Sequence, residues 1–223
     1  MNQVEIFKDE RATGYNQFVE TWIPNYHYFL DCLPKLLSPI NLKDLLVVGC
    51  GTGNEIERFI NTAEHWTITG IDPSPEMLKQ ANAKLQTYSN VTLVEGLISD
   101  LSIDRKYSAA TLLLVLHFLD DNGSKLNLLK NIADRLAPGA TLIMLDITGN
   151  KNQIKQNLKV LKLLLPKGLD EEQINARLNR IENELFAVSE ERISELLEEA
   201  NFKPPFRFFQ SSIYTGWMTK RNE

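Results

Sequence analysis

The feature that most limits how this chain can fold is a short apolar run that leads directly into a glycine-rich turn. Residues 45–48 predict a buried parallel strand, and Gly49, Gly51 and Gly53 follow it at alternate positions. Because glycine has no Cβ, such a turn lets backbone N–H groups approach a ligand closely. Asp72 ends the next strand-like run, where a carboxylate can accept hydrogen bonds from a ribose diol. The turn and the acid together predict a nucleoside site on a parallel sheet.

Strand and helix patterns alternate between residues 45 and 147, which predicts an α/β, Rossmann-like, doubly wound sheet with right-handed crossovers. The expected strands are 45–48, 66–72, 91–94, 107–113 and 141–147. Between them, helices are expected from Asn54 to Asn61, after the cap Ser74, and around residues 129–136, the last one ending at 137–139. The length of the chain favours one domain over 1–223.

The two ends of this alternation carry additional helices. Residues 15–37 predict two or three short helices interrupted by Pro24 and Pro34, as part of an N-terminal helical cap over 1–40. Residues 150–187 predict two helices that are split by a proline and a glycine, and we interpret them as a lid inserted after strand five. The alternative is a structural role, in which these helices are a peripheral extension that stabilises the sheet or a dimer.

After one more helix near residues 193–200, the chain predicts a closing antiparallel hairpin. Its extended runs are 206–210 and 213–219, and Ser211-Ser212 lies between them.

Composition excludes several classes of function. The net charge of −5 gives no basic footprint for long nucleic acid. The two cysteines, Cys32 and Cys50, form neither a disulfide framework nor a cysteine zinc site, so a reducing, cytoplasmic setting without a metal is expected. Residues 1–10 do not resemble a signal peptide, and no apolar run is long enough to cross a membrane.

Several segments in order resemble class I S-adenosylmethionine-dependent methyltransferases: VVGCGTG, GIDPSPEML, VLHFL, RLAPGATLIMLD and LLEEANF. The N-terminal FKDERATGYNQF and IPNYHYFLDCL, with FFQSS near the end, resemble carboxy-S-adenosylmethionine synthase and its small-molecule methyltransferase relatives. The resemblance implies a seven-stranded sheet with an antiparallel last strand, S-adenosylmethionine as cofactor and a small-molecule acceptor. It leaves a homodimer open.

The resemblance also implies which residues bind the cofactor. They are Tyr15, Tyr26, Gly49, Cys50, Gly51, Gly53, Asp72, Pro73, Met77, Leu97, Ile98 and Leu113. In this assignment the glycine turn approaches the amino-acid part and Asp72 binds the ribose. The N-terminal tyrosines close over the cofactor, although each tyrosine is equally well explained as a packing aromatic.

Two positions depart from the family pattern. Val47 stands where the family commonly has an acid at the start of the glycine motif, and Leu97 stands where an acid usually accepts from the adenine amino group. The backbone N–H of Ile98 remains available to a ring nitrogen. Asp100 is either a replacement for the missing adenine acid or the cap of a short helix.

Methyl transfer needs alignment and exclusion of water more than a fixed catalytic motif, because the sulfonium is already a reactive donor. His117 is the candidate catalytic residue, since histidine can accept a proton near neutral pH. Alternatively, His117 has a purely structural role and packs at the start of a helix. Asp146 ends strand five on the same rim, either near the substrate or as a loop cap.

Three alternative functions remain for a chain with this sequence. A carboxy-S-adenosylmethionine synthase or tRNA-pathway enzyme would need a cation for the extra carboxylate, and Leu196 stands where the synthase has an arginine. A nicotinamide dehydrogenase is disfavoured because Asn54 replaces the third glycine of its motif. A non-catalytic protein on the same scaffold is the third.

Overall fold

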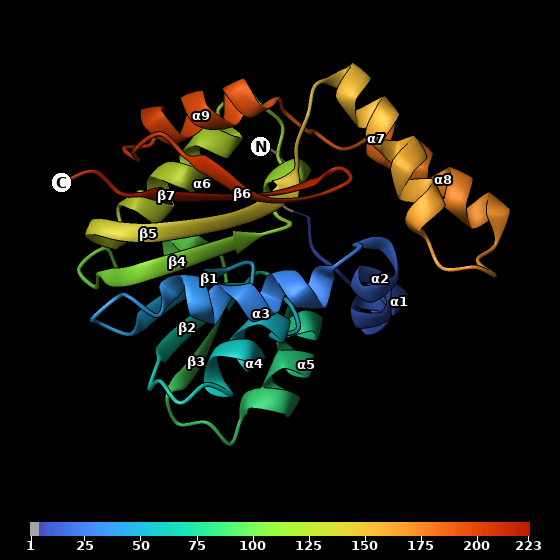
Figure 1. Ribbon diagram of the computed structural model, residues 1–223. Helices are drawn as coiled ribbons and strands as arrows, with labels where there is room; N and C mark the ends of the chain where they lie inside the picture. Colours follow the sequence, from blue (N-terminus) through green and yellow to red (C-terminus); the bar gives the residue numbers. More distant parts are fainter. Residues whose placement is uncertain (1–4) are drawn as a thin grey trace.

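The computed structural model describes residues 5–223 and contains a seven-stranded sheet in the order β3-β2-β1-β4-β5-β7-β6 (Figure 1). Strands β1 to β5 are parallel, and β7 pairs antiparallel with both β5 and β6. The expected Rossmann-like sheet with an antiparallel last strand is therefore confirmed. The strands are β1 Asp44–Val48, β2 Thr67–Asp72, β3 Val91–Glu95, β4 Tyr107–Leu113, β5 Leu136–Ile147, β6 Phe206–Ser211 and β7 Tyr214–Lys220.

Helices cover both faces of the sheet. Figure 1 shows α3, α4 and α5 on one face, α6 and α9 on the other, and the α7–α8 pair beside the N-terminal helices α1 and α2. The helices are α1 Asp9–Thr13, α2 Tyr15–Trp22, α3 Tyr26–Leu37, α4 Asn54–Ile60, α5 Pro75–Leu85, α6 Ser124–Ala133, α7 Lys151–Leu164, α8 Glu171–Asn183 and α9 Glu190–Glu199. Two short 3₁₀ turns, η1 Ile98–Asp100 and η2 Leu116–Phe118, follow β3 and β4.

The alternation of side chains along β1 separates two apolar cores. Leu45 and Val47 pack into the core beneath α3, α4 and α5, whereas Leu46 and Val48 pack beneath α6 and α9. All four are almost fully buried, as a parallel strand covered on both faces requires. Ligands of such sheets bind at the carboxyl ends of the strands, so this architecture decides where the site lies.

Three local predictions are wrong in detail. Strand β5 begins at Leu136, which pairs with Tyr107, and not at Thr141. Residues 137–139 do not end the preceding helix but protrude as an irregularity in the β4–β5 ladder, where Gly139 has a φ of +74°. Pro34 does not interrupt a helix, because α3 continues through it to Leu37 with the proline ring buried in the packed face.

The two predicted helices of residues 150–187 are confirmed as α7 and α8, with the break between them. Helix α1 is not predicted by the sequence pattern, because its five residues show no apolar periodicity. Ser211 belongs to β6, so the closing turn begins at Ser212. Among the described residues, no helix has the length and apolar character needed to cross a membrane.

Candidate active site

One large cavity opens at the carboxyl ends of β1, β2 and β4. Its volume is about 950 Å³, and its walls come from the turns after these strands, the N-terminal segment and α8. Nine of the predicted cofactor residues line it: Tyr15, Gly49, Gly51, Asp72, Pro73, Met77, Leu97, Ile98 and Leu113. His117 lines the same cavity. The topology therefore brings together residues that are far apart in the sequence.

The three glycines of the turn are surrounded by different atoms, so a Cβ at each position would contact a different part of the structure. A Cβ on Gly51, whose φ is +50°, would lie 3.2 Å from Cε of Met77, on the cavity wall. A Cβ on Gly49 would lie 2.5 Å from Cγ2 of Val115, and one on Gly53 would lie 2.8 Å from Cδ1 of Leu85. Gly53 lines no cavity and serves the packing of α4 on α5, so the structure does not bring it to the site as predicted.

Asp72 connects the glycine turn to the next helix. Its Oδ2 accepts from the Gly51 backbone N–H at 2.9 Å, and its Oδ1 accepts from Ser74 N–H at 2.9 Å. Ser74 caps α5 through Met77 N–H. Burial raises the pKa of Asp72, although both backbone hydrogen bonds oppose the shift. The carboxylate is held in place and keeps lone pairs that can accept from a ligand.

Of the residues predicted to face adenine, Ile98 begins η1 and Leu97 directly precedes it. Asp100 caps this turn, because its Oδ2 accepts from Leu97 N–H at 2.8 Å. A Cβ on Gly96 would lie 2.7 Å from the same oxygen, so this glycine is required for the cap. Asp100 is therefore the helix cap of the two alternatives, and the Leu97 side chain is partly exposed beside the cavity.

A second, much smaller cavity of about 20 Å³ adjoins the glycine turn. It is lined by Tyr26 and Cys50, which do not line the large cavity, together with Glu55. The Glu55 carboxyl accepts a hydrogen bond from the Thr111 hydroxyl, and burial raises the pKa of Glu55 to about 8. No cationic side chain pairs with Glu55 among residues 5–223. The sequence analysis missed this acid, although a threonine inside the apolar β4 run was a signal.

A polar network joins α2 to the glycine turn. Asn16 Oδ1 accepts from the Thr52 hydroxyl at 2.6 Å and from Asn54 Nδ2 at 3.0 Å. These bonds position the neighbouring Tyr15, whose pKa burial raises well above its usual value. The Tyr26 hydroxyl accepts from Asn54 Nδ2 at 3.4 Å, and burial raises its pKa as well.

His117 and Asp146 form a buried pair. The His117 Nδ1 lies 2.8 Å from Oδ1 of Asp146, and the backbone N–H groups of Leu116, His117 and Ile147 also donate to this carboxylate. Because a carboxylate only accepts, Nδ1 carries the proton and Nε2 remains as the nitrogen that can face a ligand. Asp146 is thus both a loop anchor and the orienting partner of His117.

The turn that carries His117 is braced by a buried cation. The Lys125 ammonium donates to the carbonyl oxygens of Leu116 and Leu119 at 2.6 Å each, and to that of Phe186 at 2.7 Å. Because Phe186 follows α8, this ammonium fixes the turn η2 relative to the α7–α8 segment.

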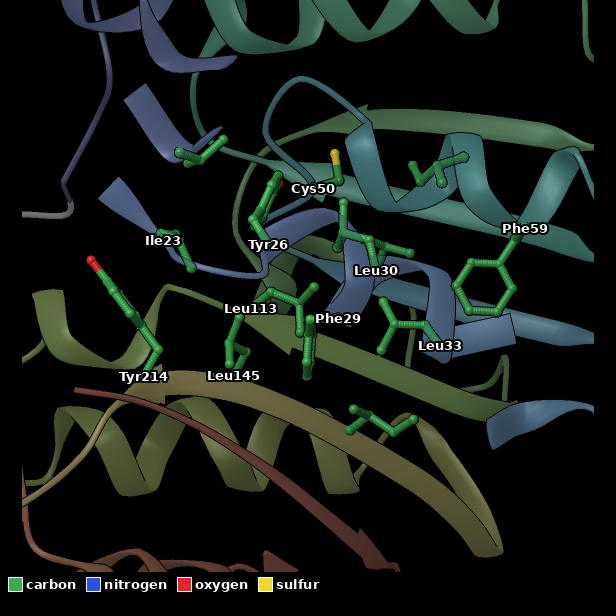
Figure 2. Packing of buried hydrophobic residues seen from close by; sticks show 14 of the residues in the cluster. Ile23, Tyr26, Phe29, Leu30, Leu33, Cys50, Phe59, Leu113, Leu145 and Tyr214 are labelled. Carbon is green, nitrogen blue, oxygen red and sulfur yellow. The ribbon is translucent and has the colours of Figure 1, made fainter. Parts of the chain in front are cut away.

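Aromatic and cationic side chains complete the cavity, and the sequence analysis did not single them out. Phe7 packs edge-on against Tyr15 and Phe118, with ring centroids 5.5 and 5.7 Å apart. Arg177 of α8 and Tyr214 of β7 line the same wall. Figure 2 shows Tyr214 at the margin of the packed cluster, with its hydroxyl oxygen pointing out of that cluster.

Comparison with known proteins agrees with this geometry. A family profile described as a methyltransferase domain matches residues 46–142. A carboxy-S-adenosyl-L-methionine synthase of Helicobacter pylori is 29% identical over 216 residues, covering 91% of this chain and 88% of the relative. A synthase of the same name from Yersinia pseudotuberculosis is 23% identical over 225 residues, covering 96% and 92%. These matches make the chain similar to S-adenosylmethionine-dependent methyltransferases.

Solved structures with this fold include enzymes with different acceptors. The plantazolicin methyltransferase BpumL, in complex with a substrate analogue and S-adenosylhomocysteine, superposes with a TM-score of 0.73 at 12% identity, over 97% of this chain and 92% of its own. Human N-acetylserotonin methyltransferase, in complex with S-adenosylmethionine, gives a TM-score of 0.66 at 18% identity, over 96% of this chain and 56% of the human chain.

Proposed function

We propose that this protein transfers the methyl group of S-adenosylmethionine to a small molecule that binds in the large cavity. One observation carries the proposal: the cavity joins the glycine turn and Asp72 at one end to the Asp146-oriented His117. The cofactor supplies an electrophilic methyl group on a sulfonium. The chain supplies alignment, a closed apolar environment and a group that can accept a proton.

The residues present fit the cofactor. Gly51 leaves the space that a Cβ would fill beside Met77, and Asp72 presents a fixed carboxylate at the same wall. We assign ribose binding to Asp72 and contacts with the adenine to Met77, Leu97 and Ile98. Pro73, Gly49 and Leu113 complete the predicted cofactor wall.

We assign binding of the cofactor's ammonium group to Glu55. Val47, where relatives of this type commonly carry an acid, is fully buried in the apolar core and offers none. Glu55 lies on the other side of the glycine turn, in the small polar cavity with Tyr26, and has no cationic partner among the described residues. A bound ammonium would lower the pKa of Glu55, because a nearby positive charge offsets the cost of burying the carboxylate.

His117 is the proposed general base. Its Nδ1 proton is held by Asp146, which leaves Nε2 to accept a proton from the acceptor's nucleophile. The burial of both side chains keeps water away from this pair. An acceptor that is already deprotonated would need only the alignment.

A carboxy-S-adenosylmethionine synthase activity is the second candidate, favoured by the names of the relatives. Leu196, where that enzyme is expected to carry an arginine, is a fully buried residue of α9 in the core between α9 and the sheet, and it lines neither of the two cavities. A cation for a carboxylated cofactor would have to come from another element.

The decisive experiment is mass spectrometry of the ligand released by heat from the purified protein. S-adenosylmethionine or S-adenosylhomocysteine supports methyl transfer, and the carboxylated cofactor supports the second candidate. Calorimetric titration with S-adenosylhomocysteine follows. A folded protein that yields no ligand and does not bind S-adenosylhomocysteine would contradict both activities and favour the non-catalytic scaffold.

The setting of the enzyme is also a proposal. We infer a cytoplasmic protein, because Cys32 and Cys50 are both free thiols. We further infer that α7 and α8 are a lid over the acceptor, because α8 lines the cavity. Whether this lid also forms a homodimer surface is a question for sedimentation analysis.

A further inference from the structure

The inner face of α8 brings two arginines to the wall of the large cavity, and their surroundings differ. Arg180 is neutralised by Glu5 at 3.2 Å and by Glu184 at 3.7 Å. Arg177 lies one helical turn earlier and forms no ion pair with any carboxylate of residues 5–223. The two side chains therefore present a matched pair, in which one cation has counter-ions and the other has none.

The contacts of Arg177 hold its guanidinium toward the cavity. Its Cζ lies 4.5 Å from the centre of the Phe18 ring, and its side chain hydrogen-bonds Tyr214. Its Nε is buried without a hydrogen-bond partner, and burial lowers its pKa. A guanidinium in this state lacks the acceptors that it is built to bind.

The rest of the wall describes the body of the ligand. The same wall carries the rings of Phe7 and Phe118 and the apolar side chains of Leu119 and Leu128. These four side chains offer shape and no charge. Besides Asp72 and Arg177, the charged side chains of the wall are Glu5, Glu10 and Arg11 of the N-terminal segment and Arg180 of α8. An acceptor that fills this space is apolar or aromatic in its middle.

We propose that the methyl acceptor is a small apolar or aromatic molecule that bears a carboxylate. Arg177 binds this carboxylate in a bidentate ion pair, and the Tyr214 hydroxyl donates a further hydrogen bond to it. A guanidinium matches the two oxygens of a carboxylate, and such charge-assisted pairs are strong where water is excluded. This proposal rests on the proposed methyl transfer and adds the class of its acceptor. It also assigns to α8 the selection of the acceptor.

The test uses the full chain saturated with S-adenosylhomocysteine and pairs of carboxylates and amides that differ only in charge. The probes are benzoate and benzamide, phenylacetate and phenylacetamide, and indole-3-acetate and indole-3-acetamide, each titrated by calorimetry. We expect at least one carboxylate to bind about tenfold or more tightly than its own amide.

The variants separate Arg177 from its neighbour. In Arg177→Gln the preference for the carboxylate should fall to about one, whereas Arg180→Gln, whose cation already has counter-ions, should keep it. Arg177→Lys keeps the positive charge but loses the bidentate geometry of the guanidinium, so it should retain part of the preference for the carboxylate over the amide. The affinity for S-adenosylhomocysteine should stay within about twofold in all three variants, because none lies at the cofactor end.

Equal affinities for carboxylates and amides, a preference that survives in Arg177→Gln, or no binding by any carboxylate of the panel would overturn the proposal. The comparison of carboxylate with amide in the unaltered protein decides the question even if a variant fails to fold. Failure of the proposed function has a different signature: either the ligand released by heat is the carboxylated cofactor, or the unaltered protein does not bind S-adenosylhomocysteine at all.

Discussion

At the scale of single residues, the site depends on carboxylates whose surroundings differ. Asp72 is held by two backbone N–H groups, Asp146 by three and by the His117 ring, and Glu55 by one hydroxyl. Hydrogen bonds to the ionised form offset part of the cost of burial, and the two at Asp72 oppose the rise that burial causes in the pKa of Asp72. Glu55 has the fewest donors and keeps its proton to about pH 8.

Removal of the Asp72 carboxylate should weaken cofactor binding. Asp72→Ala loses the charged acceptor proposed for the ribose, and we expect the affinity for S-adenosylhomocysteine to fall by about 1.5–3 kcal/mol. Glu95→Ala is the matched control, because Glu95 ends the neighbouring strand β3 and is exposed outside the cavity. Unchanged affinity in a folded Asp72→Ala protein would contradict the assignment.

The raised pKa of Glu55 leads us to expect that cofactor binding releases a proton. If the cofactor's ammonium lies beside Glu55, binding at pH 7 ionises a group that is protonated in the free protein, whose pKa is about 8. Calorimetry of S-adenosylhomocysteine in buffers of different ionisation enthalpy should report close to one proton released. Glu55→Gln should remove this release, and an unchanged proton count in that variant would exclude Glu55 from the site.

The same group predicts how stability depends on pH. The pKa of Glu55 is higher in the folded than in the unfolded chain, so the unfolded state loses its proton first as the pH rises. Stability should therefore decrease between about pH 4.5 and 8 relative to Glu55→Gln, which has no such proton. Urea unfolding at pH 5, 6.5 and 8 measures the difference.

His117 should act on transfer and not on cofactor binding. His117→Ala is expected to keep the affinity for S-adenosylhomocysteine within about twofold and to lower the transfer rate by about 10²-fold or more. Asp146→Asn is the companion variant, because it should disturb the orientation of the ring without removing it. A large loss of cofactor affinity in folded His117→Ala would place the histidine on the cofactor side.

At the scale of secondary-structure elements, the N-terminal segment bridges the sheet domain and the proposed lid. The Ser74 hydroxyl donates to the Phe7 carbonyl at 2.6 Å, and Asp9 N–H donates to Glu76 at 2.7 Å. Glu5 then pairs with Arg180 of α8. Opening of the cavity must therefore break contacts on two elements together.

This bridge predicts coupled hydrogen exchange. Exchange in α8 and in residues 9–13 should slow together when S-adenosylhomocysteine and a carboxylate ligand are bound. Glu5→Gln should speed exchange in both segments by roughly fivefold, since partly exposed ion pairs contribute up to about 1 kcal/mol. Glu184→Gln removes a pair within α8 alone and is the control. Equal hydrogen exchange in the free and ligand-bound states would favour a purely structural role of these helices over a lid.

At the scale of the whole molecule, cofactor binding should stabilise the fold. Saturation at about 100 times Kd adds about 2.7 kcal/mol, which is roughly 5–10 °C in Tm for a chain of this size. Gly51→Ala should lose most of this shift, because the added Cβ enters the cavity wall. Gly168→Ala also has a positive φ but faces open space in the α7–α8 loop, so it should keep the shift. Equal shifts in both variants would contradict a cofactor site at Gly51.

Local sequence patterns were sufficient to predict the sheet, its parallel centre and the edge at which ligands bind. These follow from local rules: apolar runs of strand length, glycines where a turn needs positive φ, and a capped helix after Asp72. The same rules failed at Pro34 and at residues 137–139, where tertiary packing and the β4 register outweighed the local signals.

Which polar residues share the site depends on contacts between elements that are distant in the sequence. Thr111 and Glu55 lie 56 residues apart and meet because α4 packs over β4. Arg177 and Tyr214 come from an inserted helix and the last strand, and nothing in the local pattern relates them. Spacing along the chain predicts positions within one element, whereas contacts between distant elements depend on how the whole sheet is covered.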